Sequence, residues 1–182
     1  MFYKLNLKID VDKAQEYFLT LKNDFQHKKW EANIQDKKIF GWSLHILNGV
    51  TGNYGFYDAK TEPLGIENYY RSEICFGWAE DILNLFPYGY RAGVGASPPG
   101  TVVPPHIDEN WKDMMRLHIP IFTNTSYVWH THLPDFHMKL GNAYIVDTSN
   151  LHGTTNNGDT DRVHFGMNIP RNNVDDVLKF LY

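Results

Sequence analysis

Residues 99–108 read PGTVVPPHID, residues 116–122 read RLHIPIF, and residues 162–169 read RVHFGMNI. These runs are rich in β-branched and aromatic residues, and Gly, Pro or Asn separates them from their neighbours. The same pattern of residue types recurs from Tyr88 onward and predicts short strands over 88–95, 101–108, 116–122, 126–132, 143–147 and 162–169. Short strands at this spacing are typical of a sandwich or barrel of jelly-roll type.

The residues on either side of this region predict helices. After Asp12, a suitable N-cap, apolar residues recur every three or four positions and predict an amphipathic helix. Further helices are expected over about 72–85, ending before Pro87, and over 174–181 (VDDVLKFL), while a strand is expected over 39–47. We therefore expect one mainly β domain over 1–182 with flanking helices: a helical and mixed part at about 1–87, a β core at about 88–170, and a C-terminal helix at about 172–182.

The composition excludes several classes of protein. The chain has 182 residues, one cysteine, and 17 Lys and Arg against 21 Asp and Glu. Cys75 cannot form an internal disulfide, which suits a reducing compartment, and the acidic balance argues against a nucleic-acid partner. No apolar run approaches the roughly 18 residues of a membrane-spanning helix, and the start lacks a signal-peptide core. We expect a cytoplasmic protein without a membrane partner.

The histidines are concentrated in the predicted β core. Seven of the nine lie between residues 106 and 164. On a strand, residues i and i+2 share a face, so His106 and Asp108 would present an imidazole and a carboxylate together. Such a pair is a weak signal by itself, but Pro104-Pro105 constrain the backbone before it. His152 follows a strand and a polar loop, so a neighbouring strand would bring it beside the pair.

This set of side chains predicts an open metal site. Two histidines and one carboxylate on one face of a metal leave adjacent coordination positions free, as in non-haem Fe(II) oxygenases. A structural zinc site would need four closed ligands, typically including thiolates, and the chain has one cysteine. We therefore predict metal binding by His106, Asp108 and His152.

Two arginines predict a pocket for small acidic molecules. Arg162 comes ten residues after His152, and its rigid fork suits a carboxylate, so it would hold the far end of a dicarboxylate whose near end chelates the metal. Arg116 and His118 form a second alternating pair that shares a face. An alternative for Arg162 is a surface ion pair with Asp159 or Asp161.

Three segments in this order resemble a known family. PGTVVPPHID (99–108), RLHIPI (116–121), and DTSNLH (147–152) followed by Arg162 are similar to the aspartyl/asparaginyl β-hydroxylase-like group of Fe(II)- and 2-oxoglutarate-dependent dioxygenases. The resemblance covers about 88–169 and implies a double-stranded β-helix, a cupin-like fold. It implies that His106, Asp108 and His152 bind the metal and that Arg162 grips the distal carboxylate of 2-oxoglutarate. It also implies that His118 contacts the cosubstrate and that Arg116 meets a substrate or cosubstrate carboxylate.

One departure bears on the substrate. The peptide hydroxylases that name the family lack the triad carboxylate, whereas this chain has Asp108, like the bacterial cis-proline hydroxylase branch. The resemblance therefore implies hydroxylation of a C–H bond in a free amino acid such as proline, or in an Asp, Asn or Pro residue of a peptide. The reaction would use Fe(II), 2-oxoglutarate and dioxygen, and ascorbate would support it.

Several alternatives stay open. The domain would alternatively be a cupin-like metalloenzyme that does not use 2-oxoglutarate, or a non-catalytic metal- or ligand-binding module. His130, His132 and His137 form a possible rival metal site, although we favour places at the pocket mouth. The remaining histidines, His27, His45 and His164, are expected to be structural, as is Asp147, which would shape the loop before His152. Candidate aromatic residues for the pocket are Trp42, Trp111 and Trp129.

Overall fold

The computed structural model describes residues 2–50, 63–108, 112–131 and 134–181. Its largest element is a seven-stranded antiparallel sheet in the order β1 (Phe2–Leu5), β10 (Ala143–Val146), β8 (Met114–Phe122), β12 (Arg162–Pro170), β6 (Tyr90–Ser97), β3 (Lys37–Ser43) and β2 (Trp30–Ile34). A three-stranded antiparallel sheet is formed by β7 (Val102–His106), β11 (His152–Asn156) and β9 (Tyr127–Thr131). A two-stranded antiparallel sheet pairs β4 (His45–Leu47) with β5 (Tyr69–Arg71). This arrangement confirms the predicted double-stranded β-helix.

The larger sheet has two different faces because its strands alternate. On β12, Val163, Phe165 and Met167 belong to the main hydrophobic core, whereas Arg162 and His164 line a cavity on the other side. The strand β8 follows the same rule, with Leu117, Ile119 and Ile121 in the core and Arg116 and His118 at the cavity. Because successive side chains of a strand point to opposite faces, one face of the sheet packs in the core and the other lines the polar space between the sheets.

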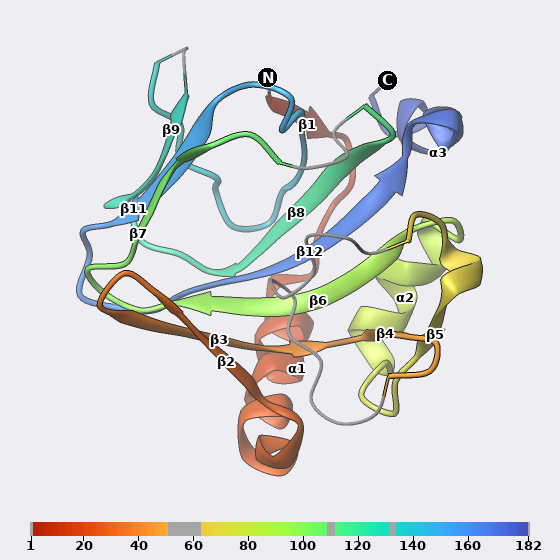
Figure 1. Cartoon of the computed structure of the whole chain (residues 1–182), viewed down its shortest axis with the longest axis horizontal. Helices are drawn as coiled ribbons and strands as arrows, with labels where there is room; N and C mark the ends of the chain where they lie inside the picture. The colour runs from red at the N-terminus through yellow and green to blue at the C-terminus, as the bar shows by residue number, and fades with distance from the viewer. Residues whose placement is uncertain (1, 51–62, 109–111, 132–133, 182) are drawn as a thin grey trace.

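The helices cover the apolar face of the larger sheet (Figure 1). The helix α1 (Val11–Asp24) buries Ala14, Tyr17, Phe18 and Leu21, as its periodicity predicts. Its N-cap is Asp10 rather than Asp12, because the Asp10 carboxylate accepts a hydrogen bond from the backbone N–H of Lys13. Asp12 lies in the first turn, where a negative charge also favours the helix.

The other two helices are shorter than predicted. The helix α2 spans Gly77–Leu85 rather than 72–85, because the backbone N–H of Ser72 donates to Leu44 and its hydroxyl donates to Ser43. These bonds hold the segment before the helix against the sheet. The helix α3 spans Asp175–Leu178, and short 3-10 helices cover Gln26–Lys28, Ile66–Asn68 and Arg171–Asn173.

The strand predictions were right for most of the β core and incomplete elsewhere. All six strands predicted from Tyr88 onward are present, and each end lies within two residues of its predicted position; β7, for example, ends at His106 rather than at 108. The predicted strand over 39–47 is divided into β3 and β4 at Leu44. The strands β1, β2, β5 and β11 were not predicted, and β1 and β2 form the two edges of the larger sheet.

No helix in the described ranges is long and apolar enough to span a membrane.

Candidate metal centre

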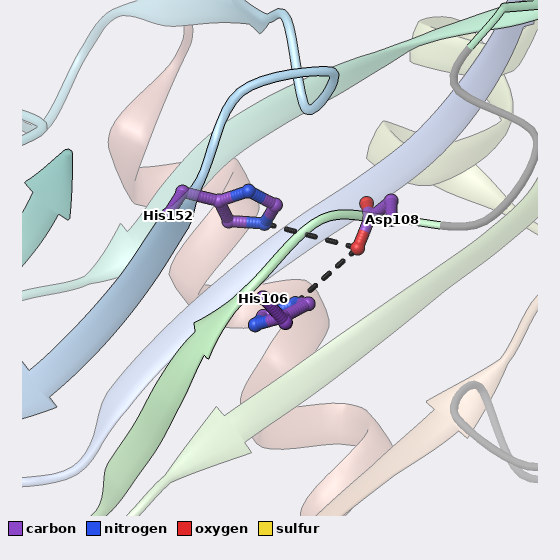
Figure 2. A group of neighbouring side chains, drawn as sticks. All are labelled: His106, Asp108 and His152. Atoms are coloured by element: carbon purple, nitrogen blue, oxygen red, sulfur yellow. Dashed lines mark ion pairs between the residues drawn. The ribbon is translucent and has the colours of Figure 1, made fainter. Parts of the chain in front are cut away.

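The predicted triad comes together where the smaller sheet pairs β7 with β11. His106 is the last residue of β7, His152 is the first of β11, and the antiparallel register places them opposite one another. Asp108 lies two residues beyond β7, and its carboxylate points at both rings (Figure 2). Its Oδ1 is 3.3 Å from His106 Nε2 and 3.7 Å from His152 Nε2. Among the described residues, this is the only set of three or more His, Cys, Asp or Glu side chains whose ligand atoms all lie within 4.8 Å of one another.

The backbone orients both imidazole rings toward a common centre. His106 Nδ1 lies 2.8 Å from the carbonyl oxygen of Pro104, and His152 Nδ1 lies 3.0 Å from that of Asn150. Since a carbonyl oxygen only accepts, each Nδ1 carries a proton and donates, so Nε2 is the nitrogen that each ring would present to a metal once it carries no proton. Metal-binding histidines are usually fixed in this way. The donor set therefore fits a divalent metal.

Asp108 is held in its ionised form. Burial by itself would raise the pKa of this carboxyl, but the positive charge of Arg116 and the hydrogen bond from His106 outweigh it and lower the pKa well below its usual range. The Nε of Arg116 donates to Asp108 Oδ2 over 2.5 Å, which leaves Oδ1 facing the histidines. Burial lowers the pKa of His152, which favours its neutral form, and the hydrogen bond to Asp108 raises the pKa of His106 against burial. An ionised carboxylate and a neutral imidazole are the forms that bind metals.

A cavity of about 110 Å³ adjoins the triad between the two sheets. All six predicted site residues line it: His106, Asp108, Arg116, His118, His152 and Arg162. The volume is far below the roughly 300 Å³ of pockets for drug-sized ligands. The enclosed space therefore suits a small molecule.

The cavity wall is rich in buried groups that can contact a ligand. His118 is 6% exposed, and neither of its ring nitrogens has a hydrogen-bond partner among the described residues. The same holds for Trp129 Nε1 and Thr148 Oγ1, both of which are buried at the cavity. Leaving a buried polar atom unbonded costs about 1–3 kcal/mol. A ligand with several acceptor oxygens would relieve this cost.

Arg162 gives the cavity wall a buried positive charge. It is 2% exposed, so the alternative of a surface ion pair with Asp159 or Asp161 is wrong. Its guanidinium carbon lies 4.5 Å from the centroid of the Tyr127 ring. Burial lowers the pKa of His118 well below its ordinary value, and the charges of Arg162 and Arg116 lower it further. His118 is therefore neutral, and the cationic groups of the cavity are the arginines.

Comparison with known proteins assigns this region to a family. Residues 88–172, which contain all six site residues, match the family model described as aspartyl/asparaginyl beta-hydroxylase. Residues 88–172 are therefore similar to that family. The match confirms the predicted class of enzyme, a non-haem Fe(II)/2-oxoglutarate-dependent hydroxylase. A comparison of the chain with curated proteins finds no match.

Solved structures with the same fold include oxygenases of this class. A prolyl-4-hydroxylase from Pseudomonas putida superposes with a TM-score of 0.58 at 11% identity, covering 93% of this chain and 92% of that one. An oxidoreductase of the 2OG-Fe(II) oxygenase family from Burkholderia pseudomallei gives 0.54 at 10% identity, with coverage of 85% and 89%. The viral collagen prolyl hydroxylase of Paramecium Bursaria Chlorella virus-1 gives 0.53 at 9% identity, with coverage of 93% and 94%. At these identities the likeness establishes the fold.

Other predicted histidines of the hydroxylase domain bond to groups away from the triad. His130 Nδ1 lies 3.0 Å from Asp135 Oδ1, and its Nε2 lies 2.9 Å from Thr155 Oγ1. His137 Nδ1 lies 3.0 Å from the carbonyl oxygen of Tyr127. His132, the third member of the rival site, is outside the described residues. Both nitrogens of His130 are therefore engaged without a metal.

The remaining candidates are divided between scaffold and cavity. Trp42 is fully buried in the main core, Trp129 lines the cavity, and Trp111 is outside the described residues. Asp147 Oδ1 accepts from the backbone of Ser149 and from Arg171, which shapes the loop before His152 as expected. His27 lies 3.8 Å from Glu73 at the surface, and His45 accepts a bond from the backbone of Ala92.

His164 lines the cavity, although a structural role was expected for it from the sequence. It is 3% exposed and lines the same cavity as the triad. The signal was available, because Arg162 and His164 alternate on β12 as Arg116 and His118 do on β8. Tyr127, Ser97 and Thr154 also line the cavity and carried no motif that would have singled them out.

Proposed function

We propose that this hydroxylase acts on a C–H bond of a free amino acid such as proline, or of an Asp, Asn or Pro residue in a peptide. The observation that carries the proposal is the open His106–Asp108–His152 set beside a cavity that is also lined by the buried Arg162. A dicarboxylate cosubstrate has one end for the metal and one for Arg162. The substrate class is supported by Asp108, which distinguishes this triad from that of the peptide hydroxylases named in the family.

The residues present would divide the work. His106, Asp108 and His152 would hold Fe(II), which supplies the activation of dioxygen and the coupling of 2-oxoglutarate decarboxylation to hydroxylation. Arg116 keeps Asp108 ionised and oriented. Arg162 would bind the distal carboxylate of 2-oxoglutarate, and His118 would contact the cosubstrate between that arginine and the metal. The closed wall behind them would exclude water.

The exposure of the triad is unequal and suggests where a substrate would approach. The His106 side chain is 43% exposed, whereas those of His152 and Asp108 are 7% and 13% exposed. With a cosubstrate in the small cavity, a substrate would reach the metal from the side of His106. This geometry suits a compact molecule or one residue of a flexible peptide.

A succinate-release assay tests the proposal. The purified protein would be incubated with Fe(II), 2-oxoglutarate and ascorbate against free amino acids, proline included, and short peptides that contain Asp, Asn or Pro. We expect at least one compound to accelerate succinate release, and a chelator to abolish it. A chelator-sensitive activity that ignores 2-oxoglutarate would select the cupin-like alternative. Metal binding without succinate release across the panel would select a non-catalytic module.

A blocked substrate distinguishes the two substrate classes. If the free amino acid is the substrate, amidation of its carboxyl and acetylation of its amine should remove most of the stimulation. If a peptide residue is the substrate, the blocked form should stimulate succinate release at least as well as the free one. Mass analysis of the product, with a gain of one oxygen atom, confirms that hydroxylation accompanies succinate release.

A further inference from the structure

His164 occupies a position in the larger sheet where its neighbours cannot bond to its ring. The antiparallel register pairs it with Gly95 on β6 and with Pro120 on β8. Gly95 has no side chain, and a methyl group built there would lie 3.6 Å from His164 Cε1 and 3.9 Å from its Nε2. The side chain of Pro120 has no hydrogen-bonding atom. The imidazole is therefore placed over a gap in the sheet surface, with no polar side chain at the directly paired position of either neighbouring strand.

The buried ring keeps a nitrogen available to a ligand. His164 is 3% exposed, and its Nδ1 is buried with no hydrogen-bond partner among the described residues. A histidine whose only role is to pack would bond such a nitrogen to the protein, since an unbonded buried polar atom costs about 1–3 kcal/mol. His164 lines the cavity, so the partner that satisfies Nδ1 would come from the cavity contents.

The position on β12 indicates which part of a ligand His164 would meet. It is two residues from Arg162, so both side chains leave the same face of the strand. Its ring centroid is 5.2 Å from that of His118, which lies on β8 two residues from the paired Pro120 and also lines the cavity. A ligand anchored by Arg162 would therefore lie against His164 before it reaches the metal.

We propose that His164 donates a hydrogen bond from Nδ1 to the distal carboxylate of 2-oxoglutarate, beside Arg162. The pocket would then recognise the second carboxylate through two groups on one strand, and it would discriminate against 2-oxo acids that lack this carboxylate. This inference rests on the proposed use of 2-oxoglutarate. It assigns a binding role to a residue that belongs neither to the triad nor to the cosubstrate candidates Arg116, His118 and Arg162.

A binding experiment without turnover tests the proposal. The protein would be loaded with Ni(II), which the same ligand types can hold, and titrated by calorimetry with 2-oxoglutarate and with 2-oxopentanoate, which lacks the distal carboxylate. His164→Leu keeps much of the volume and removes the nitrogen. His164→Asn places an amide N–H near the position of Nδ1, whereas His164→Gln places it near Nε2. His27→Leu, a change at an exposed histidine, is the matched control.

The expected pattern separates contact from packing. His164→Leu should weaken 2-oxoglutarate binding on the order of 10- to 100-fold, as for a lost bond to a charged group, and should change 2-oxopentanoate binding little. His164→Asn should restore most of the affinity for 2-oxoglutarate. His164→Gln should bind as weakly as His164→Leu, and His27→Leu should bind like the wild type. Equal weakening of both acids, or no weakening in His164→Leu, would overturn the proposal.

Three outcomes keep the test decisive. If His164→Leu does not fold, the Asn and Gln variants still decide, because equal affinities for 2-oxoglutarate in these two would contradict a contact at Nδ1. If the Ni(II)-loaded wild type binds neither acid, the proposed function fails and this inference fails with it. If the wild type binds 2-oxoglutarate and all variants match it, only this inference fails.

Discussion

The two faces of the larger sheet are made from alternate residues of the same strands, yet they differ in kind. The helix-covered face of β8 and β12 carries only apolar side chains, among them Leu117 and Phe165, which are fully buried. The cavity face carries Arg162, His164 and His118, which are almost as buried but polar. Apolar burial stabilises a fold, whereas buried polar groups without partners oppose it. One face therefore supplies the stability that lets the other hold groups for a ligand.

Phe165→Ala should give the largest change in stability. The ring is fully buried and meets Trp78 edge-on, with centroids 5.8 Å apart. Removing a buried phenylalanine typically lowers the free energy of unfolding by about 3–5 kcal/mol. Urea unfolding followed by circular dichroism measures the loss. The neighbouring change on the other face, His164→Leu, should lower the free energy of unfolding by less than a third as much; equal losses would remove the distinction between the faces.

His45 should make the scaffold sensitive to acid. It is buried away from the cavity, and burial, with a smaller effect of the Arg71 charge, lowers its pKa from 6.5 to about 4. A histidine with a lowered folded pKa stabilises the fold fully above pH 6.5, and this contribution is lost as the pH falls through 4. The shift corresponds to about 3 kcal/mol at most.

The measurement compares unfolding free energies at pH 7 and pH 4.5 in the wild type and in His45→Gln. The variant removes the titrating group, so its loss of stability on acidification should be smaller than that of the wild type. The same acid-induced loss in both proteins would show that His45 does not cause it.

Tyr127→Leu should have the smallest effect, and this effect should be on 2-oxoglutarate binding. The Tyr127 ring supports the guanidinium of Arg162 at 4.5 Å, and a cation–π contact contributes about 0.5–2 kcal/mol. Without the ring face, the apparent KM for 2-oxoglutarate should rise by roughly 2- to 30-fold with little change in kcat. Tyr127→Phe keeps the ring face and should retain the wild-type KM. A kcat effect without a KM effect in Tyr127→Leu would argue against this role.

Alternation and motif spacing predicted most of the site, because they depend on local geometry. The spacing within His106–Asp108 and Arg116–His118 predicted shared faces, and Arg162 was expected at the same pocket; the cavity contains all of them. The bond from Arg116 to Asp108 was not predicted, because it depends on the placement of Asp108, which lies beyond the end of β7, relative to β8. The roles of these residues in binding Fe(II) and 2-oxoglutarate stay predictions.

The strand β11 shows why part of the fold could not be predicted from the sequence. Its sequence, HGTTN, is polar and contains glycine, so it resembles a loop. The strand is nevertheless paired on both sides, with β7 and β9. A side chain at Gly153 would come within 2.7 Å of the carbonyl oxygen of Val103, so the glycine allows a close backbone approach. Pairing with two distant segments, rather than local propensity, makes this segment a strand.

Substitution of the two triad histidines tests whether they hold the catalytic metal. Succinate release would be measured with Fe(II), 2-oxoglutarate, ascorbate and the best substrate of the panel, in the wild type, His106→Ala, His152→Ala and the surface control His27→Ala. We expect loss of turnover to background in both triad variants, with unfolding free energies close to that of the wild type, and full activity in the control. Undiminished turnover in both His106→Ala and His152→Ala would contradict this expectation.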